Sequence, residues 1–148
     1  MTKTFRISLF LFLSVVFVLP AQSGGCTFSV TFSTKRNGVL YFELIDENYF
    51  STGSGMQAGD IKPVVPGSDG KYYYTHIFTD LPEGEYIIQC FLDTNGNGEM
   101  DTGAFGIPKE PYGNSQNFHP KFSPPGFEDV SFELTPETEE ISITLIEK

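Results

Sequence analysis

The chain has 148 residues, a length that suits one domain rather than two. Hydrophobic residues make up 39% of the chain and aromatic residues 15%, which supports a well-filled core and excludes wholesale disorder. Because 9 Lys and Arg face 19 Asp and Glu, the formal net charge is −10, the wrong sign for a nucleic-acid partner.

Residues 1–23 have the pattern of a signal peptide. Lys3 and Arg6 precede an apolar stretch at 7–19, and small residues follow it. Its 13 residues are too few to cross the roughly 30 Å hydrocarbon core of a bilayer as a helix. We therefore expect export of a single domain, residues 24–148, to the periplasm, the outer membrane or the cell exterior.

The two cysteines, Cys26 and Cys90, leave three alternatives open. The small residues before Cys26 are similar to the acylation site of bacterial lipoproteins, although the usual Leu three places earlier is missing. A disulfide between the two cysteines is the second alternative, since an exported compartment permits one. Two unpaired thiols are the third. A lipid anchor on Cys26 is the one membrane association that we expect.

Alternation of apolar and polar residues with a period of two dominates the chain after Cys26 and predicts half-buried strands. The alternating segments are 28–33, 40–44, 71–79, 85–92, 130–134 and 141–145, and 61–65 suits a short edge strand. Asn37-Gly38 predicts a hairpin turn, and the polar, glycine-rich segment 46–59 predicts a loop. The fold class is therefore all-β, an antiparallel sandwich of six to seven strands, Ig-like or prealbumin-like.

Residues 93–129 form a long Pro/Gly-rich loop, which we expect to be functional or held by a ligand. It opens with oxygen-bearing side chains at positions 1, 3, 5 and 9 of a calcium-type loop: Asp93, Asn95, Asn97 and Asp101. Gly98 suits the sharp turn at position 6, and Glu99 at position 7 offers its carbonyl.

This loop is not an EF-hand, because position 12 is Ala104 instead of a bidentate Glu. A further carboxylate from Glu99, Glu110, Glu128 or Asp129 would complete the set of ligands. We therefore predict a weak Ca²⁺ site. The alternative is an Asx-rich turn, in which the side chains accept hydrogen bonds from their own backbone.

Lys109, Glu110 and Tyr112 place a cation, an anion and an aromatic ring beside this loop. They are a candidate recognition surface for a glycan, a peptide or an envelope protein. The alternative is that the two charges are solvated and that Tyr112 caps the sandwich. The sequence contains no HExxH, GxSxG or P-loop motif, and we assign no catalytic residue.

The function expected from these features is that of an exported, non-enzymatic module whose Ca²⁺-stabilised loop is a binding or interaction platform. Two other functions stay open. One is a purely structural module of an envelope assembly. The other is a hydrolase that uses carboxylates from the segment 93–129.

The segment 78–86, Phe-Thr-Asp-Leu-Pro-Glu-Gly-Glu-Tyr, resembles the strand-turn-strand motif of prealbumin-like and carboxypeptidase-regulatory-like sandwiches, where it closes a hairpin against the core. Together with the Asp93 loop, the segment 105–113 and the Pro-Pro-Gly-Phe-Glu-Asp run at 124–129, it resembles DUF2141, a bacterial family of unknown function. The chain departs from that family after Gly113, where Asn-Ser-Gln-Asn replaces the usual Phe-Ser-Asn. The resemblance implies a small exported sandwich and no particular activity.

Overall fold

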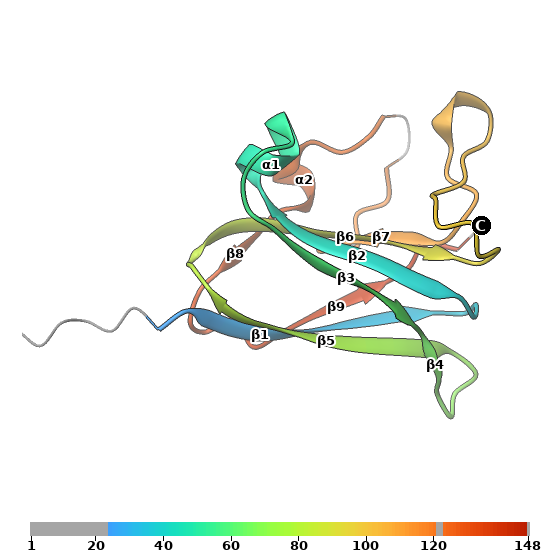
Figure 1. Ribbon diagram of the computed structural model, residues 1–148, viewed down its shortest axis with the longest axis horizontal. Helices are drawn as coiled ribbons and strands as arrows, with labels where there is room; N and C mark the ends of the chain where they lie inside the picture. Colours follow the sequence, from blue (N-terminus) through green and yellow to red (C-terminus); the bar gives the residue numbers. More distant parts are fainter. Residues whose placement is uncertain (1–23, 121–122, 148) are drawn as a thin grey trace, which may run out of the picture.

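The computed structural model describes residues 24–120 and 123–147, so the predicted signal peptide lies outside the described residues. Two β-sheets face each other as the layers of a sandwich (Figure 1). Sheet A has the order β4 (Val65–Pro66), β5 (Tyr72–Leu81), β1 (Cys26–Thr34) and β9 (Glu140–Thr144). Sheet B has the order β3 (Gln57–Pro63), β2 (Val39–Asp46), β6 (Gly84–Asp93) and β7 (Tyr112–Asn114), with β8 (Phe132–Leu134) also paired to β6.

The helical segments are α1 (Glu47–Thr52), α2 (Phe127–Val130) and the 3₁₀ helix η1 (Ala104–Gly106). The predicted all-β sandwich is thus confirmed. None of the helices in the described part of the chain is long and apolar enough to cross a membrane.

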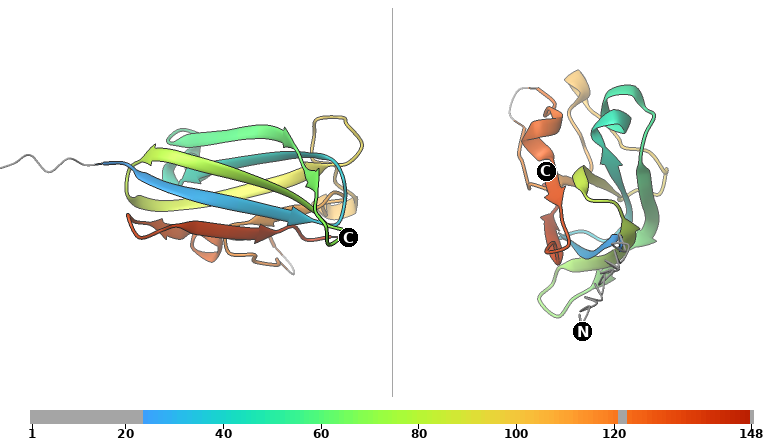
Figure 2. Two further views of the ribbon diagram at one scale, coloured as in Figure 1. Left: turned by 90° about the horizontal axis from the view of Figure 1, so that it is seen from below. Right: turned by 90° about the vertical axis from the view of Figure 1, so that its left-hand side faces the viewer.

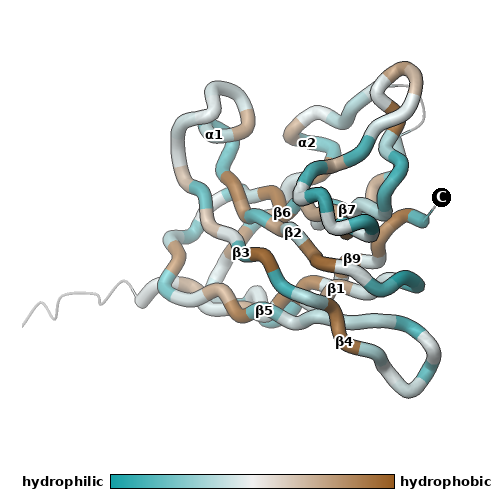
Figure 3. The backbone as a smooth tube through the Cα atoms, turned by 45° about the vertical axis from the view of Figure 1, so that its right-hand side comes forward, coloured by the Kyte–Doolittle hydropathy of each residue, from teal (hydrophilic) through white to brown (hydrophobic). Residues whose placement is uncertain are grey.

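The core lies between the two sheets and is built from the alternating residues that the sequence predicted to be buried. Phe28, Phe32 and Leu40 are each 1% exposed or less. The rings of Phe32 on β1 and Phe42 on β2 meet across the sheets, with centroids 5.0 Å apart. Along the strands, hydrophobic and hydrophilic residues follow one another closely (Figure 3), because successive side chains point to opposite faces.

Two turns that the sequence favours as hairpins connect the two sheets instead (Figure 2). β1 pairs with β5 and β9, whereas β2 pairs with β3 and β6, so the hairpin predicted at Asn37-Gly38 is wrong. A side chain at Gly38 would begin 2.5 Å from the carbonyl oxygen of Asp93, so close backbone packing explains this glycine.

The turn between β5 and β6 also crosses from one sheet to the other, so the segment that resembles the prealbumin-like motif does not close a hairpin. The hydroxyl of Tyr86 donates a hydrogen bond of 3.0 Å to the carbonyl of Pro82 and ties the new strand back to the turn. The last strand differs from the antiparallel expectation as well, since β9 runs parallel to β1.

The predicted loop at 46–59 contains α1 and the first residues of β3. Asp46 begins this helix as its N-cap, because its carboxylate accepts a hydrogen bond of 2.7 Å from the Tyr49 N–H. Gly53 ends the helix in the left-handed conformation, with φ of 70°. Six residues are too few to reveal helical periodicity, which explains why the sequence pattern did not predict this element.

Candidate functional site

The Asp93 loop, residues 93–101, leaves sheet B at the end of β6 and is held by its first side chain. Asp93 is 3% exposed, and its carboxylate accepts hydrogen bonds from Gly96 N–H at 2.6 Å and Gly98 N–H at 2.8 Å. Burial by itself would raise the pKa of Asp93, but these donors and the Asn95 N–H outweigh it and hold the pKa below its usual value. Asp93 is therefore the carboxylate around which the loop coils.

The other predicted ligands gather in the same loop and form Asx turns. The side-chain oxygens of Asn95 and Asn97 accept hydrogen bonds of 2.9 and 3.0 Å from the backbone N–H two residues ahead. The Asn95 amide nitrogen donates to Asp101 at 2.6 Å, whereas the Glu99 side chain is exposed. In the described part of the chain, no group of three or more His, Cys, Asp or Glu side chains is arranged to hold a metal ion.

Glu110 braces this loop from the irregular segment that leads into β7. Its side chain is 3% exposed, so the alternative in which Glu110 is solvated is wrong. One carboxylate oxygen accepts from the Thr94 N–H at 2.7 Å and from the Thr94 hydroxyl at 3.2 Å, and the other accepts from the Asp101 N–H at 3.3 Å. Glu110 therefore joins the two ends of the Asp93 loop.

The remaining candidates for a further metal ligand, Glu128 and Asp129, lie on α2. This helix packs against Ile87 near the opposite end of β6, six residues before Asp93. At about 3.3 Å per residue, roughly 20 Å of strand separates them from the loop. The structure therefore does not bring Glu128 or Asp129 to the predicted calcium site.

Of the predicted recognition residues, Tyr112 lines a groove of about 890 Å³ on the outer face of sheet B, whereas the exposed Lys109 lies beside η1 outside it. Strand register sets two rows of side chains across this face. An aromatic and apolar row consists of Ile61, Tyr41, Phe91 and Tyr112. A polar row, two residues along each strand, consists of Gly59, Glu43, Gln89 and Asn114.

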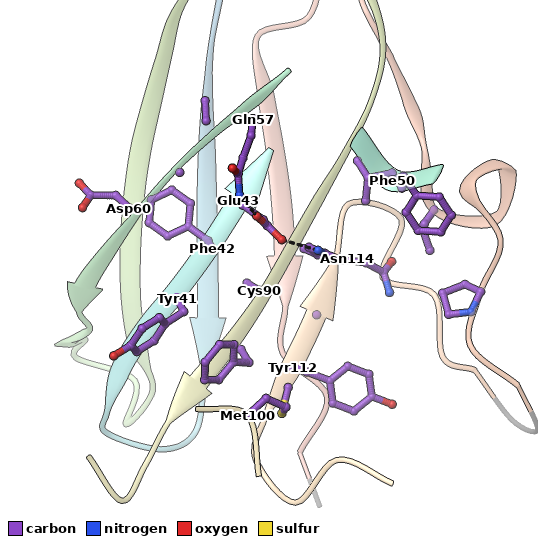
Figure 4. A pocket seen from close by; sticks show the side chains of 18 of the residues that line it. Tyr41, Phe42, Glu43, Phe50, Gln57, Asp60, Cys90, Met100, Tyr112 and Asn114 are labelled. Carbon is purple, nitrogen blue, oxygen red and sulfur yellow. Dashed lines mark hydrogen bonds between the residues drawn. The ribbon is translucent and has the colours of Figure 1, made fainter. Parts of the chain in front are cut away.

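Stacking and hydrogen bonds give the groove floor a fixed arrangement (Figure 4). The rings of Tyr41 and Phe91 stack with centroids 4.7 Å apart and planes 15° apart. Glu43 accepts a hydrogen bond of 2.6 Å from the Gln57 amide and a second from the Gln89 amide. Both oxygens of the carboxylate are thus oriented before any ligand arrives.

Different parts of the chain line the two ends of the groove. At one end, Phe50 of α1 stands beside Phe127 of α2, with ring centroids 5.8 Å apart. At the other end, Met100 of the Asp93 loop lines the groove, and a side chain at Gly98 would begin 3.4 Å from the Tyr41 hydroxyl. The predicted calcium loop is therefore one wall of the groove.

Our sequence interpretation missed Tyr41, Glu43, Gln89 and Phe91. They lie on β2 and β6 and face away from the core, between the residues that were predicted to be buried. The two aromatic residues among them, on an outward face, were the sequence feature that could have indicated this site. The chain's departure from the family pattern after Gly113 also reaches this site, since Asn114 lines the groove.

Both cysteines are free thiols buried in the core, so the disulfide alternative is not formed. Cys26 pairs with Leu81, next to the β5–β6 turn, whereas Cys90 lies six residues beyond Gly84 along β6. At about 3.3 Å per residue this offset is roughly 20 Å, far beyond the reach of a disulfide. Burial also raises the pKa of both thiols. Acylation would require the Cys26 thiol to leave the core.

Comparison with known proteins adds a family but no activity. Residues 29–142 match the family described as "Uncharacterized protein conserved in bacteria (DUF2141)". No curated protein and no solved structure matches the sequence. The match covers most of the sandwich, including β6, the Asp93 loop and the groove. The chain therefore belongs to the DUF2141 family.

Proposed function

We propose that this protein is an exported, non-enzymatic binding module that holds a small ligand in the groove on sheet B. The groove itself carries the proposal: it is concave, mostly apolar, and has a few oriented polar groups, as ligand sites do. The residues of its floor come from four strands of a hydrogen-bonded sheet, so the floor has a fixed arrangement before binding.

The test is protein-observed NMR with a probe panel of phenethylammonium, cellobiose and glycyl-phenylalanine. We expect at least one probe to shift the resonances of Tyr41, Phe91 and Tyr112, and not those of Thr75 on the outer face of sheet A. Phe91→Leu should weaken that response, because it removes one ring of the stack. A panel that leaves the groove resonances unchanged would contradict the proposal.

Calcium has a supporting role in this proposal, as an ion that stabilises the wall formed by the Asp93 loop. The side chains of Asp93, Asn95, Asn97 and Asp101 lie in one tight loop and, with the Glu99 carbonyl, offer oxygen ligands of the kind that Ca²⁺ binds. Binding would replace the hydrogen bond from Asn95 to Asp101. The two carboxylates suit a weak site.

Thermal unfolding in Ca²⁺ and in EDTA tests this part separately. An ion that binds only the folded loop adds about 2.7 kcal/mol of stability at a hundredfold excess over its Kd. Asp93→Asn should abolish the calcium-dependent rise in Tm, whereas Glu128→Gln, a carboxylate on the distant α2, should preserve it. A Tm that is the same in EDTA and Ca²⁺ means that hydrogen bonds alone hold the loop.

A further inference from the structure

We infer that the ligand of the groove carries a protonated amine, which binds over Glu43 while its carbon skeleton lies along the aromatic row. This inference rests on the binding function proposed above and names the chemical class of the ligand. Its basis is the charge, the hydrogen bonding and the spacing of the groove floor.

The charge of the floor is negative and is not balanced by the described residues that line the groove. Among the described residues that line the groove, the only charged ones are Glu43 and Asp60, both acidic. Asp60 forms an ion pair with Lys62 at 2.9 Å, and its side chain points away from Glu43 in Figure 4. The two side chains that donate hydrogen bonds to Glu43, Gln57 and Gln89, are neutral amides. A cationic ligand would supply the charge that this carboxylate lacks.

Hydrogen bonding favours a ligand that donates. A carboxylate has about four acceptor positions, and the amides of Gln57 and Gln89 use two of those on Glu43. Asn114, in the same row, donates to the Phe118 carbonyl and accepts from the Phe118 N–H, so its amide serves its own loop. An ammonium group has three donors and no acceptor, so it can fill the two positions left on Glu43.

The spacing lets one ligand use both rows. Adjacent rows lie two residues apart along the strands, or about 7 Å. A ligand whose amine contacts Glu43 can therefore place a carbon skeleton of about this length against the Tyr41 and Phe91 rings. Gly59 occupies the polar row beside Glu43, where a Cβ would lie 3.1 Å from the Glu43 Cβ, so β2 and β3 pack closely at this point.

A neutral sugar is the other ligand that an aromatic groove with a carboxylate suggests. The floor favours the amine because its carboxylate charge has no counterpart among the described lining residues, and a charged donor forms a stronger hydrogen bond with a carboxylate than a neutral sugar hydroxyl does. The outcome with a sugar probe therefore distinguishes the two.

Phenethylammonium and 2-phenylethanol test the inference, because they share size and aromatic body and differ in the charged amine. In NMR titrations at pH 7, we expect the amine to bind roughly tenfold or more tightly than the alcohol. Glu43→Gln should remove this preference, because it should weaken binding of the amine far more than binding of the alcohol. Glu47→Gln, the same change on α1 outside the groove, should keep the preference. Thermal unfolding of each variant confirms that it is folded.

Other results overturn the inference in distinguishable ways. Equal binding of both probes, weakened for both by Phe91→Leu, refutes the amine and leaves the groove as a binding site. If cellobiose binds and phenethylammonium does not, the amine is also refuted, and the groove is a site for neutral sugars. If neither aromatic probe, nor cellobiose, nor glycyl-phenylalanine shifts the groove resonances, the amine and the proposed binding function fail together.

Discussion

Replacing Glu110 by Ala should destabilise the protein, because this residue fastens the Asp93 loop at both ends. The buried carboxylate accepts hydrogen bonds of 2.7 and 3.2 Å from Thr94 and of 3.3 Å from Asp101. A hydrogen bond to a charged group contributes about 1.5–3 kcal/mol, and only the shortest of the three has the geometry for that range. With the two longer bonds adding less, we expect a loss of about 3 kcal/mol.

Chemical denaturation monitored by circular dichroism, with Tm from calorimetry, measures this loss. For a domain of this length, 3 kcal/mol corresponds to a fall of roughly 10 °C in Tm. Glu110→Gln keeps one acceptor oxygen and should cost about half as much. Glu99→Ala, an exposed carboxylate in the same loop, should stay within about 0.5 kcal/mol of the parent protein. If Glu110→Ala also lies within 1 kcal/mol of the parent, Glu110 does not hold the loop.

Two further predictions concern the scaffold. Gly113→Ala should lower the free energy of unfolding in urea by about 1–3 kcal/mol, because the new Cβ would lie 2.8 Å from the Ile143 side chain. Gly103→Ala is the control, since the atom nearest to its Cβ would be 3.4 Å away. The pKa of Asp46 is held down by hydrogen bonds from the Tyr49 and Met56 N–H groups, so its stabilisation is present above about pH 4 and is lost as the pH falls through the folded-state pKa. Asp46→Asn should therefore flatten the dependence of Tm on pH below pH 4, and an unchanged acid profile would contradict this.

Alternation of apolar and polar residues predicted the strands of this fold, because each strand shows by itself which of its two faces is buried. Phe28, Phe32 and Phe42 face the core whichever sheet their strand joins. The same independence explains the wrong hairpin at Asn37-Gly38: a period of two specifies the buried face of each strand, but not which strand lies beside it. The pairing depends on contacts far apart in sequence, such as the parallel register of β1 with β9.

The site was harder to predict than the fold for the same reason. The Asp93 loop could be found because its ligand-like residues are consecutive in sequence. The row that joins Tyr41, Phe91 and Tyr112 exists only through the register of three strands. The role of Glu110 likewise depends on the return of the chain past Thr94, which no local pattern encodes.

The loop and the groove should act as one unit, and Glu110 allows this coupling to be measured. Glu110 does not line the groove, yet it holds the Asp93 loop in place. That loop brings Met100 to the groove wall and Gly98 beside the Tyr41 hydroxyl. Glu110→Gln should therefore weaken binding of a groove probe, phenethylammonium, by at least about fivefold. Glu128→Gln, an equal change of charge on α2, should leave the affinity unchanged. The contrary result is a Glu110→Gln variant that binds the probe as tightly as the parent protein although its loop amides exchange faster with solvent. In that case the groove keeps its shape without the loop, and the two are not coupled.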